Sequence, residues 1–426
     1  MKIKVSEKSY DEVCNQPREK HVKPKKQSAV WRHLMKTLSA GELKATNFTY
    51  ETVGMENLGK DEPALFLMNH SSFTDLQITS KLLADRQYHI VMTNDGFVGK
   101  AGLMRMIGCI PVRKFILDST LIKDMLYAIN TLKSSILMYP EASYSFDGTQ
   151  TPLPASLGKC IKLLKVPVVM IRTKGAFLRD PLYNNLQKRK VNVSAKEILL
   201  LTKEDVEEKS VDEINDILAN AFEYNHFKEQ VEAGILIDEP FRADGLHRPL
   251  YKCISCGSED SMHGEGTTIT CKACGDTHEL MADGRLKRTS EDKALHMEYV
   301  TDWYAWERKA VREEIENKTY STELDVEIMM LVDTKSMYKV GKGHLSHTEK
   351  GWRLTGCDGK IDFTQSVKNS YSLYADYFWY EIGDMIAIGD TKAQYYCFPK
   401  NNYPVAKARL ATEEMYKSQL YYGRKK

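Results

Sequence analysis

Short apolar runs alternate with longer helical patterns along the first half of the chain. The apolar runs have the length of buried strands, and they lie at 64–68, 88–92, 135–139 and 166–171. Apolar side chains at helical spacing lie between these runs at 76–83 and 121–132, and after the last run at 211–231. This alternation predicts an α/β domain with a largely covered sheet.

The pattern changes after residue 245. A segment rich in Cys and Gly is followed by an aromatic-rich helix, expected at 300–315, and then by short β-prone runs between Gly, Asn and Asp turns. A last helix is expected at 404–416. The predicted organisation is a polar basic segment at 1–27, the α/β domain at 28–245, a cysteine-rich module at 250–288, a helical linker at 289–320, and a β-rich domain with a C-terminal helix at 321–426.

A helix is expected to begin at Ser28, a residue type that caps helix N-termini. Its apolar side chains at helical spacing are Val30, Trp31, Leu34, Met35 and Leu38. One interpretation is a core-packing helix behind the solvated lysine-rich segment that precedes it. The other is a basic helix that rests on an anionic membrane surface.

Composition narrows the class of protein. The 426 residues are too many for one ordinary domain, and 42% hydrophobic with 28% charged residues is normal for a globular rather than a disordered chain. The formal net charge of +2 points to no particular partner. No run approaches the eighteen or so apolar residues of a membrane-spanning helix, and the first residues lack the apolar core of a secretory signal. An intracellular protein is therefore expected.

The segment FLMNHSSFTDL places His70 at the end of a predicted strand and Asp75 at the start of the next helix. A carboxylate in that place fixes the imidazole tautomer, so His70 can act as a general base toward an acceptor hydroxyl that attacks an acyl carbonyl directly. With eleven histidines the spacing alone is weak, because about one such pair is expected by chance. Its place at a strand's C-terminal end, where α/β sheets carry their sites, counts for more.

Four sequence blocks in order strengthen this interpretation. They are FTYETVGMENL with ALFLMNHSSFTDL, MIGCIPVRK, LMYPEASYSFDGT and LLKVPVVMIRTKGAF. Over about residues 28–235 the chain resembles the 1-acyl-sn-glycerol-3-phosphate acyltransferase family. The resemblance implies a mixed sheet flanked by helices and a role in phospholipid biosynthesis. It also implies transfer of a fatty acyl group from acyl-CoA or acyl-carrier protein to the free hydroxyl of lysophosphatidic acid or a related lysolipid, giving phosphatidic acid.

The same resemblance suggests the residues that bind substrate. Arg113 of the second block stands where the family contacts the acceptor's phosphate. The third block departs from the family, whose commonest form is Glu-Gly-Thr-Arg, because Glu141 is followed here by Ala142, Ser143 and Tyr144. A bidentate arginine clamp is therefore missing from this loop. The expected substrate-binding residues are Asn69, Arg113, Glu141, Ser143 and Lys159, the last supplying a point charge. Glu141 has a second interpretation, in which it only anchors the loop by accepting backbone N–H bonds.

Two CxxCG knuckles predict a metal site in the cysteine-rich module. Cys253 and Cys256 form one knuckle, and Cys271 and Cys274 form the other. Four thiolates on two turns satisfy the tetrahedral preference of Zn²⁺, and in a reducing compartment they indicate a metal site rather than disulfides. We expect a structural zinc ribbon that takes no part in catalysis.

The β-rich region has the pattern of a pleckstrin-homology or GRAM-type barrel, without a diagnostic motif. With no spanning segment, the enzyme is expected to meet its lipid acceptor as a peripheral protein on the cytoplasmic, inner face of the membrane. Two alternatives stay open: an acceptor without phosphate, and a zinc-ribbon binding protein with an inactive acyltransferase domain. Nucleic acid is not an expected partner, because the basic residues around the ribbon are diluted by acidic ones.

Overall fold

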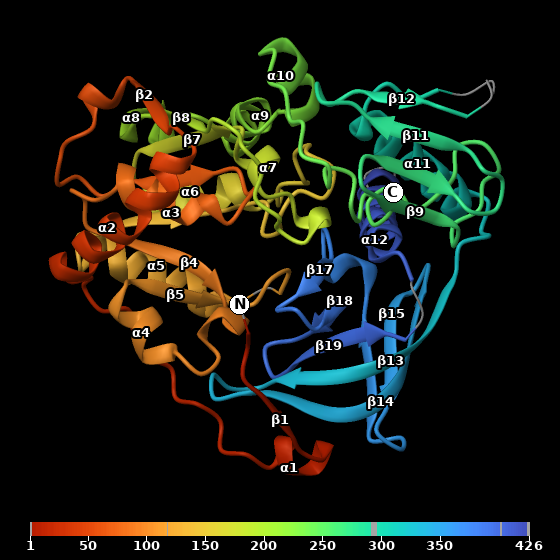
Figure 1. The fold of residues 1–426 in the computed structure, drawn as a ribbon. Helices are drawn as coiled ribbons and strands as arrows, with labels where there is room; N and C mark the ends of the chain where they lie inside the picture. The colour runs from red at the N-terminus through yellow and green to blue at the C-terminus, as the bar shows by residue number, and fades with distance from the viewer. Residues whose placement is uncertain (1, 117, 291–295, 401–402, 424–426) are drawn as a thin grey trace.

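Three sheets organise the chain (Figure 1). The structure is a computed structural model that describes residues 2–116, 118–290, 296–400 and 403–423. In Figure 1 the α/β domain lies at the left, the cysteine-rich module at the upper right and the β-rich domain at the lower right. Among the described residues, no helix combines the length and the apolar character that crossing a membrane would need.

The first sheet has seven strands in the order β2-β8-β7-β3-β6-β4-β5. Its strands are β2 (Thr49–Val53), β3 (Leu65–Met68), β4 (Tyr88–Thr93), β5 (Cys109–Val112), β6 (Ser135–Met138), β7 (Val168–Lys174) and β8 (Ser194–Leu201). Strands β3 to β7 run parallel to one another, whereas β8 runs antiparallel to β7. The sheet is therefore mixed, as the resemblance implied.

Helices cover both faces of this sheet because its central strands are apolar on both sides. On β3, Phe66 and Met68 face one core, and Leu65 and Leu67 face the other. The first core receives side chains from α2 (Ala29–Ala45), α3 (Thr74–Leu82) and α4 (Ala101–Met106). The second receives them from α5 (Ser119–Asn130), α6 (Leu157–Leu164), α8 (Lys203–Glu208) and α9 (Val211–Ala221). Ser28 caps α2 by accepting a bond from the Val30 N–H, as predicted.

The single helix expected at 211–231 is wrong. The chain forms α9 and then a separate helix, α10 (His226–Glu232). Between them Tyr224 turns inward and is buried, and Asn225 starts α10 by accepting a hydrogen bond from the Lys228 N–H. A new N-cap and an inward tyrosine interrupt a helical pattern that apolar spacing alone could not distinguish from a continuous one.

The cysteine-rich module is a small antiparallel sheet of four strands in the order β12-β11-β10-β9. Its strands are β9 (Met262–Glu265), β10 (Thr268–Cys271), β11 (Thr277–Leu280) and β12 (Leu286–Arg288). Helix α11 (Val300–Glu316) follows and packs against α12 (Val405–Gly423), the last helix of the chain. The short α7 (Ala176–Arg179) lies between the α/β sheet and this part of the molecule (Figure 1).

The β-rich region is an antiparallel meander in the order β16-β15-β14-β13-β19-β18-β17, with α12 against β17 and β18. Its strands are β13 (Thr322–Leu331), β14 (Met337–Thr348), β15 (Gly351–Gly356), β16 (Ile361–Gln365), β17 (Tyr374–Trp379), β18 (Gly383–Gly389) and β19 (Gln394–Pro399). The N-terminal segment reaches this sheet, because β1 (Val5–Glu7) pairs in parallel with β14 and α1 (Tyr10–Cys14) packs beside it. The N-terminal polar segment therefore packs against the C-terminal β-rich domain.

Candidate active site

The turn after β3 is fixed by a buried asparagine. The Asn69 amide group donates to Thr173 Oγ1 at 3.0 Å, and its oxygen accepts from the Thr173 N–H at 2.8 Å. These bonds join the ends of the neighbouring strands β3 and β7 and aim His70 out of the sheet. Asn69 is fully buried, so the structure places this expected substrate contact beneath the turn.

His70 and Asp75 meet across this turn. Nδ1 of His70 lies 3.0 Å from Oδ2 of Asp75, which also accepts the N–H groups of Ser71 at 3.0 Å and Ser72 at 3.2 Å. Because a carboxylate only accepts, the imidazole proton sits on Nδ1, and Nε2 keeps its lone pair. The sequence predicted this pair, and its geometry is that of an oriented base.

Burial controls the protonation of both groups. Burial, with the charge of Lys114 second, lowers the pKa of His70 well below its usual value. Burial raises the pKa of Asp75 to about 7, against the backbone N–H groups of Ser71 and Ser72, which lower it. His70 is therefore neutral near pH 7, the state a general base requires.

Two tyrosines enclose the imidazole. The ring centre of Tyr139 lies 4.3 Å from that of His70. The ring of Tyr144 stacks on His70 with 3.9 Å between the ring centres and 28° between the planes. Tyr144 occupies the position where the family that the sequence resembles most often has arginine. In this chain that position supplies an aromatic surface beside the base.

Glu141 holds the backbone of the same site. Its carboxylate accepts the His70 N–H at 2.8 Å, the Thr151 N–H at 2.7 Å and the Tyr224 hydroxyl at 2.8 Å. Burial raises its pKa to about 7, against these bonds. The side chain is 1% exposed. These contacts are those of the anchoring interpretation, in which Glu141 joins the third sequence block to the His70 turn.

Arg113 and Lys159 lie at the cavity described next, and Ser143 does not. Arg113 follows β5, and its Nη1 donates to Asp118 Oδ2 at 2.8 Å. Lys159 is on α6. Ser143 is buried, and its hydroxyl accepts from Arg409 Nη1 at 3.4 Å.

A cavity of about 1540 Å³ opens at His70. Its apolar wall comes from the α/β domain and includes Ile90, Met92, Met104, Ile107, Ile122 and Leu163. The β-rich domain supplies another wall with Tyr371, Tyr374, Asp376, Phe378, Trp379 and Tyr380. Sequence reasoning missed this second wall and also missed Lys114, whose Nζ lies 4.0 Å from the Tyr374 ring centre. The available signal was its place beside Arg113 in the second block.

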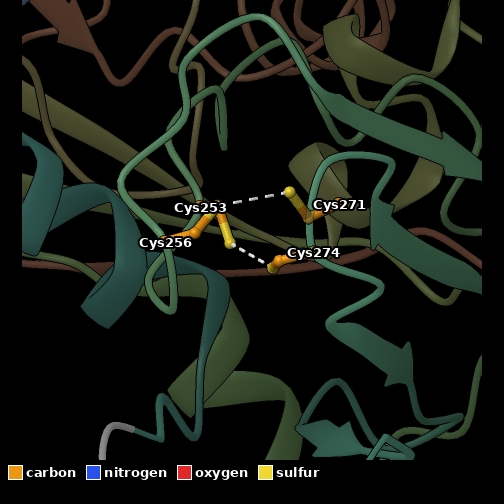
Figure 2. A group of neighbouring side chains, drawn as sticks. All are labelled: Cys253, Cys256, Cys271 and Cys274. Atoms are coloured by element: carbon orange, nitrogen blue, oxygen red, sulfur yellow. Dashed lines mark hydrogen bonds between the residues drawn. The ribbon is translucent and has the colours of Figure 1, made fainter.

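The four predicted cysteines come together (Figure 2). Their sulfur atoms all lie within 4.8 Å of one another, with Cys253 3.7 Å from Cys274 and Cys256 3.7 Å from Cys271. Thiolates bound to Zn²⁺ at about 2.3 Å in a tetrahedron lie roughly 3.8 Å apart, so the cluster fits the ion. Each knuckle ends in a glycine at positive φ, Gly257 or Gly275, which permits the tight turn.

Parts of the chain are similar to a known protein family and to a solved structure. Residues 50–174 match the family model described as Acyltransferase. Among solved structures, the chain is similar to the 1-acyl-sn-glycerophosphate (LPA) acyltransferase PlsC from Thermotoga maritima, with 14% identity over 45% of this chain and 78% of that one, at a TM-score of 0.33. No curated protein matches the chain.

Proposed function

Residues 50–174 are a domain of the acyltransferase family, and from this premise we propose that the protein acylates a lysolipid. The donor is acyl-CoA or acyl-carrier protein, and the acceptor is the free hydroxyl of lysophosphatidic acid or a related lysolipid. One observation carries the proposal: the His70–Asp75 pair leaves Nε2 of His70 available at the large, mostly apolar cavity.

The transfer proceeds by direct attack. Nε2 of His70 takes the proton of the acceptor hydroxyl as its oxygen bonds to the thioester carbonyl carbon. Asp75 stabilises the imidazolium that forms. The tetrahedral intermediate then collapses as the carbon–sulfur bond breaks, and the leaving sulfur takes the proton back from His70. The products are the acylated lipid and the free thiol of the carrier.

Arg113 and Lys159 are the proposed cationic contacts for the acceptor's phosphate. Arg113 already bonds Asp118, so a bound phosphate shares the guanidinium with that carboxylate. The guanidinium has five N–H donors, which makes this sharing possible. Asn69, Glu141 and Ser143 influence the substrate indirectly. Asn69 and Glu141 hold the His70 turn, and Ser143 belongs to the loop of the third sequence block.

A face of α2 supports peripheral binding to an anionic membrane on the cytoplasmic side. Val30 and Leu38 are each 74% exposed, and Leu34 lies one turn from both and is 42% exposed. Cations precede the helix at Lys23, Lys25 and Lys26. An exposed apolar stripe beside lysines is the pattern of an interfacial helix.

The remaining modules have structural roles in this proposal. Zn²⁺ held by the four cysteines closes the ribbon at 250–288, and full thiolate coordination leaves no position for chemistry. The β-rich region at 321–426, for which we keep the pleckstrin-homology or GRAM likeness, covers the cavity. The acyltransferase domain is proposed to span 28–245.

Acyl transfer by the purified protein is the test. Acyl-CoA and acyl-carrier protein are each offered with lysophosphatidic acid and related lysolipids, and product is detected by mass spectrometry. His70→Ala should lower the rate by about 10²- to 10⁴-fold. His344→Ala, which changes a half-exposed histidine of β14, is the matched control and should keep the wild-type rate. No product from a folded, zinc-loaded protein with any donor and acceptor would overturn the proposal.

A further inference from the structure

Two opposite charges from different domains face the same cavity as His70. Lys114 follows β5 of the α/β domain, and Asp376 lies on β17 of the β-rich domain. Both line the cavity that His70 also lines. Neither residue is among the expected substrate contacts, and the proposed acyl transfer does not use either of them.

Lys114 is held in place without an ion pair. Its Nζ lies 4.0 Å from the ring centre of Tyr374, and the Tyr374 hydroxyl in turn donates to Asp95 Oδ2 at 2.6 Å. Among the residues that the structure describes, no carboxylate forms an ion pair with Lys114. Burial lowers the pKa of Lys114, and the more distant charge of Asp376 is the first of the influences that raise it. Because Lys114 also lines the cavity, its amine can bind an anion there.

The Asp376 carboxylate can accept a further hydrogen bond from a ligand. Within the described part of the chain, the hydrogen bond to its carboxylate comes from the N–H of Tyr377, the next residue. Burial raises its pKa to about 7, and the charge of Lys114 is the first influence in the other direction. The two side chains influence each other electrostatically without forming an ion pair.

Lys114 lines the same cavity as the proposed base, His70. After burial, its charge is the influence that lowers the pKa of His70. In a lysophospholipid the free hydroxyl and the phosphate are separated by a short glycerol unit. Because Lys114, His70 and Asp376 line one cavity, a phosphate at Lys114 leaves that hydroxyl free to reach His70 and the esterified group free to reach Asp376.

We propose that Lys114 and Asp376 form a head-group subsite for a lysophospholipid whose phosphate is a diester carrying a hydrogen-bond donor, an ammonium or a hydroxyl group. This inference rests on the proposed acyl transfer and narrows its acceptor. A diester carries one negative charge for Lys114, and its head group donates to Asp376. The phosphate monoester of lysophosphatidic acid brings a second negative charge beside a carboxylate, and like charges in contact select against a ligand.

The end of β17 and the turn that follows it support a binding role for this wall. Phe378, Tyr380 and Glu381 all have positive φ, at 48°, 46° and 67°. Bulky residues adopt this conformation at a cost, and such strain gathers at ligand sites where the surroundings enforce it. The turn is fixed by the Phe378 N–H, which donates to Asp384 at 2.8 Å. It places aromatic side chains at the cavity next to Asp376.

The experiment compares kcat/KM for four lysolipids on one preparation of the full, zinc-loaded chain. Lysophosphatidylethanolamine and lysophosphatidylglycerol offer an ammonium and hydroxyl groups, lysophosphatidylcholine carries a cation without a donor, and lysophosphatidic acid is the monoester. We expect a donor-bearing diester to be preferred over both lysophosphatidylcholine and lysophosphatidic acid. Asp376→Asn should lower the ratio of the preferred lipid to lysophosphatidic acid by about ten- to hundredfold, the effect of a hydrogen bond to a charged group.

Ratios on one preparation do not depend on the fraction that is folded, so a destabilised variant still gives a clear result. Asp362→Asn, which removes an exposed carboxylate on β16 outside the cavity, is the matched control and should leave the ratio unchanged. Lys114→Met should lower kcat/KM for every phosphate-bearing acceptor. Equal use of the four lipids, or an unchanged ratio in Asp376→Asn, would overturn the subsite while leaving acyl transfer intact. No product with any lipid would overturn the proposed function instead.

Discussion

His70 is supported from two sides by carboxylates that do different work. Asp75 bonds its ring, and Glu141 bonds its backbone N–H. Both carboxylates accept from backbone N–H groups: Glu141 accepts at both oxygens, whereas the bonds to Asp75 all end at Oδ2. The geometry of the base thus depends on two acids whose pKa burial raises to about 7.

We therefore expect kcat/KM to rise as pH increases through about 7. Burial lowers the pKa of His70, so the base is already neutral below this pH, whereas Asp75 and Glu141 take up protons as the pH falls through their raised pKa of about 7. A pH profile of acyl transfer with a donor that does not itself titrate measures this. An acid limb well below pH 6 would mean that His70 alone sets the profile.

Tyr144 offers a second test at the residue scale. Its ring stacks on His70 at 3.9 Å, so Tyr144→Phe keeps the contact and should keep most of the activity. Tyr144→Ala removes the ring and should lower kcat by about two- to tenfold, the range of an aromatic pair. Comparable losses in both variants would assign the effect to the hydroxyl rather than to stacking.

How well the sequence predicts these residues follows from their separation along the chain. His70 and Asp75 meet across one turn, so their spacing in the sequence was sufficient to pair them. Lys114 gains its meaning from Tyr374 and Asp376, which lie on a different domain. No local pattern contains that information.

At the scale of elements, helix α12 supports the loop of the third block. Arg409 on α12 is 2% exposed, and its Nη1 donates to the carbonyl of Tyr144 at 3.1 Å. Its Nε donates to Glu413, which Arg308 of α11 also binds. A buried guanidinium thus joins two C-terminal helices to the loop that stacks on His70.

Arg409→Met should lower the free energy of unfolding by about 3–5 kcal/mol, because it leaves the buried Glu413 with less compensation. Activity should fall as well, since the Tyr144 carbonyl loses its donor. Urea denaturation and acyl transfer measure the two effects. Arg353→Met breaks an exposed pair with Asp362 and should cost less than about 1 kcal/mol. Equal costs in the two variants would contradict a structural role for Arg409.

The zinc ribbon is joined to helix α11 by its first knuckle. The Lys252 N–H, next to Cys253, donates to the buried Glu307 at 2.8 Å, and its carbonyl accepts from Trp303 Nε1 at 2.9 Å. Removing the metal releases the four thiolates. The backbone of Lys252, which bonds Glu307 and Trp303, is then no longer held in place by the knuckle.

A strong chelator should therefore lower the unfolding temperature and shift the fluorescence of Trp303, which is fully buried, toward the red. Metal analysis before chelation should find about one zinc per chain. Cys253→Ser should reproduce the chelated state, whereas replacement of Cys14, an exposed thiol outside the cluster, should not. A metal content far below one per chain in folded protein would refute the zinc assignment.

Elements with a strong apolar pattern were predictable, and elements without one were not. The buried runs that became β3, β4, β6 and β7 were all expected. Strand β2 was not, because it is an edge strand whose residues are all exposed. In the β-prone C-terminal region, residues 374–379 form the single strand β17, whose aromatic residues face a cavity and a neighbouring domain instead of one continuous core.

At the scale of the whole molecule, the N-terminal segment and contacts at the cavity join the two large domains. The N-terminal strand β1 pairs with β14, and the chain then crosses to α2 of the α/β domain (Figure 1). On the inner side, Asp95 of the α/β domain accepts hydrogen bonds from Tyr374 at 2.6 Å and Trp379 at 3.1 Å. These contacts join segments at opposite ends of the sequence, which is why the sequence indicated separate domains but not the shared cavity.

Asp95→Ala tests whether this junction maintains the cavity. The change removes the acceptor of the buried Tyr374 hydroxyl and leaves Trp379 Nε1 with that hydroxyl, 3.2 Å away, as its acceptor. A buried unsatisfied donor costs about 1–3 kcal/mol. Tyr374→Phe removes one donor and keeps Asp95 bonded to Trp379, so it should cost less stability. If the β17 wall positions the acceptor, Asp95→Ala should raise KM for the lysolipid more than it lowers kcat, even at temperatures where the variant is fully folded. A fall in stability with unchanged kinetics would make the junction purely structural, and the acceptor would then depend on the α/β domain alone.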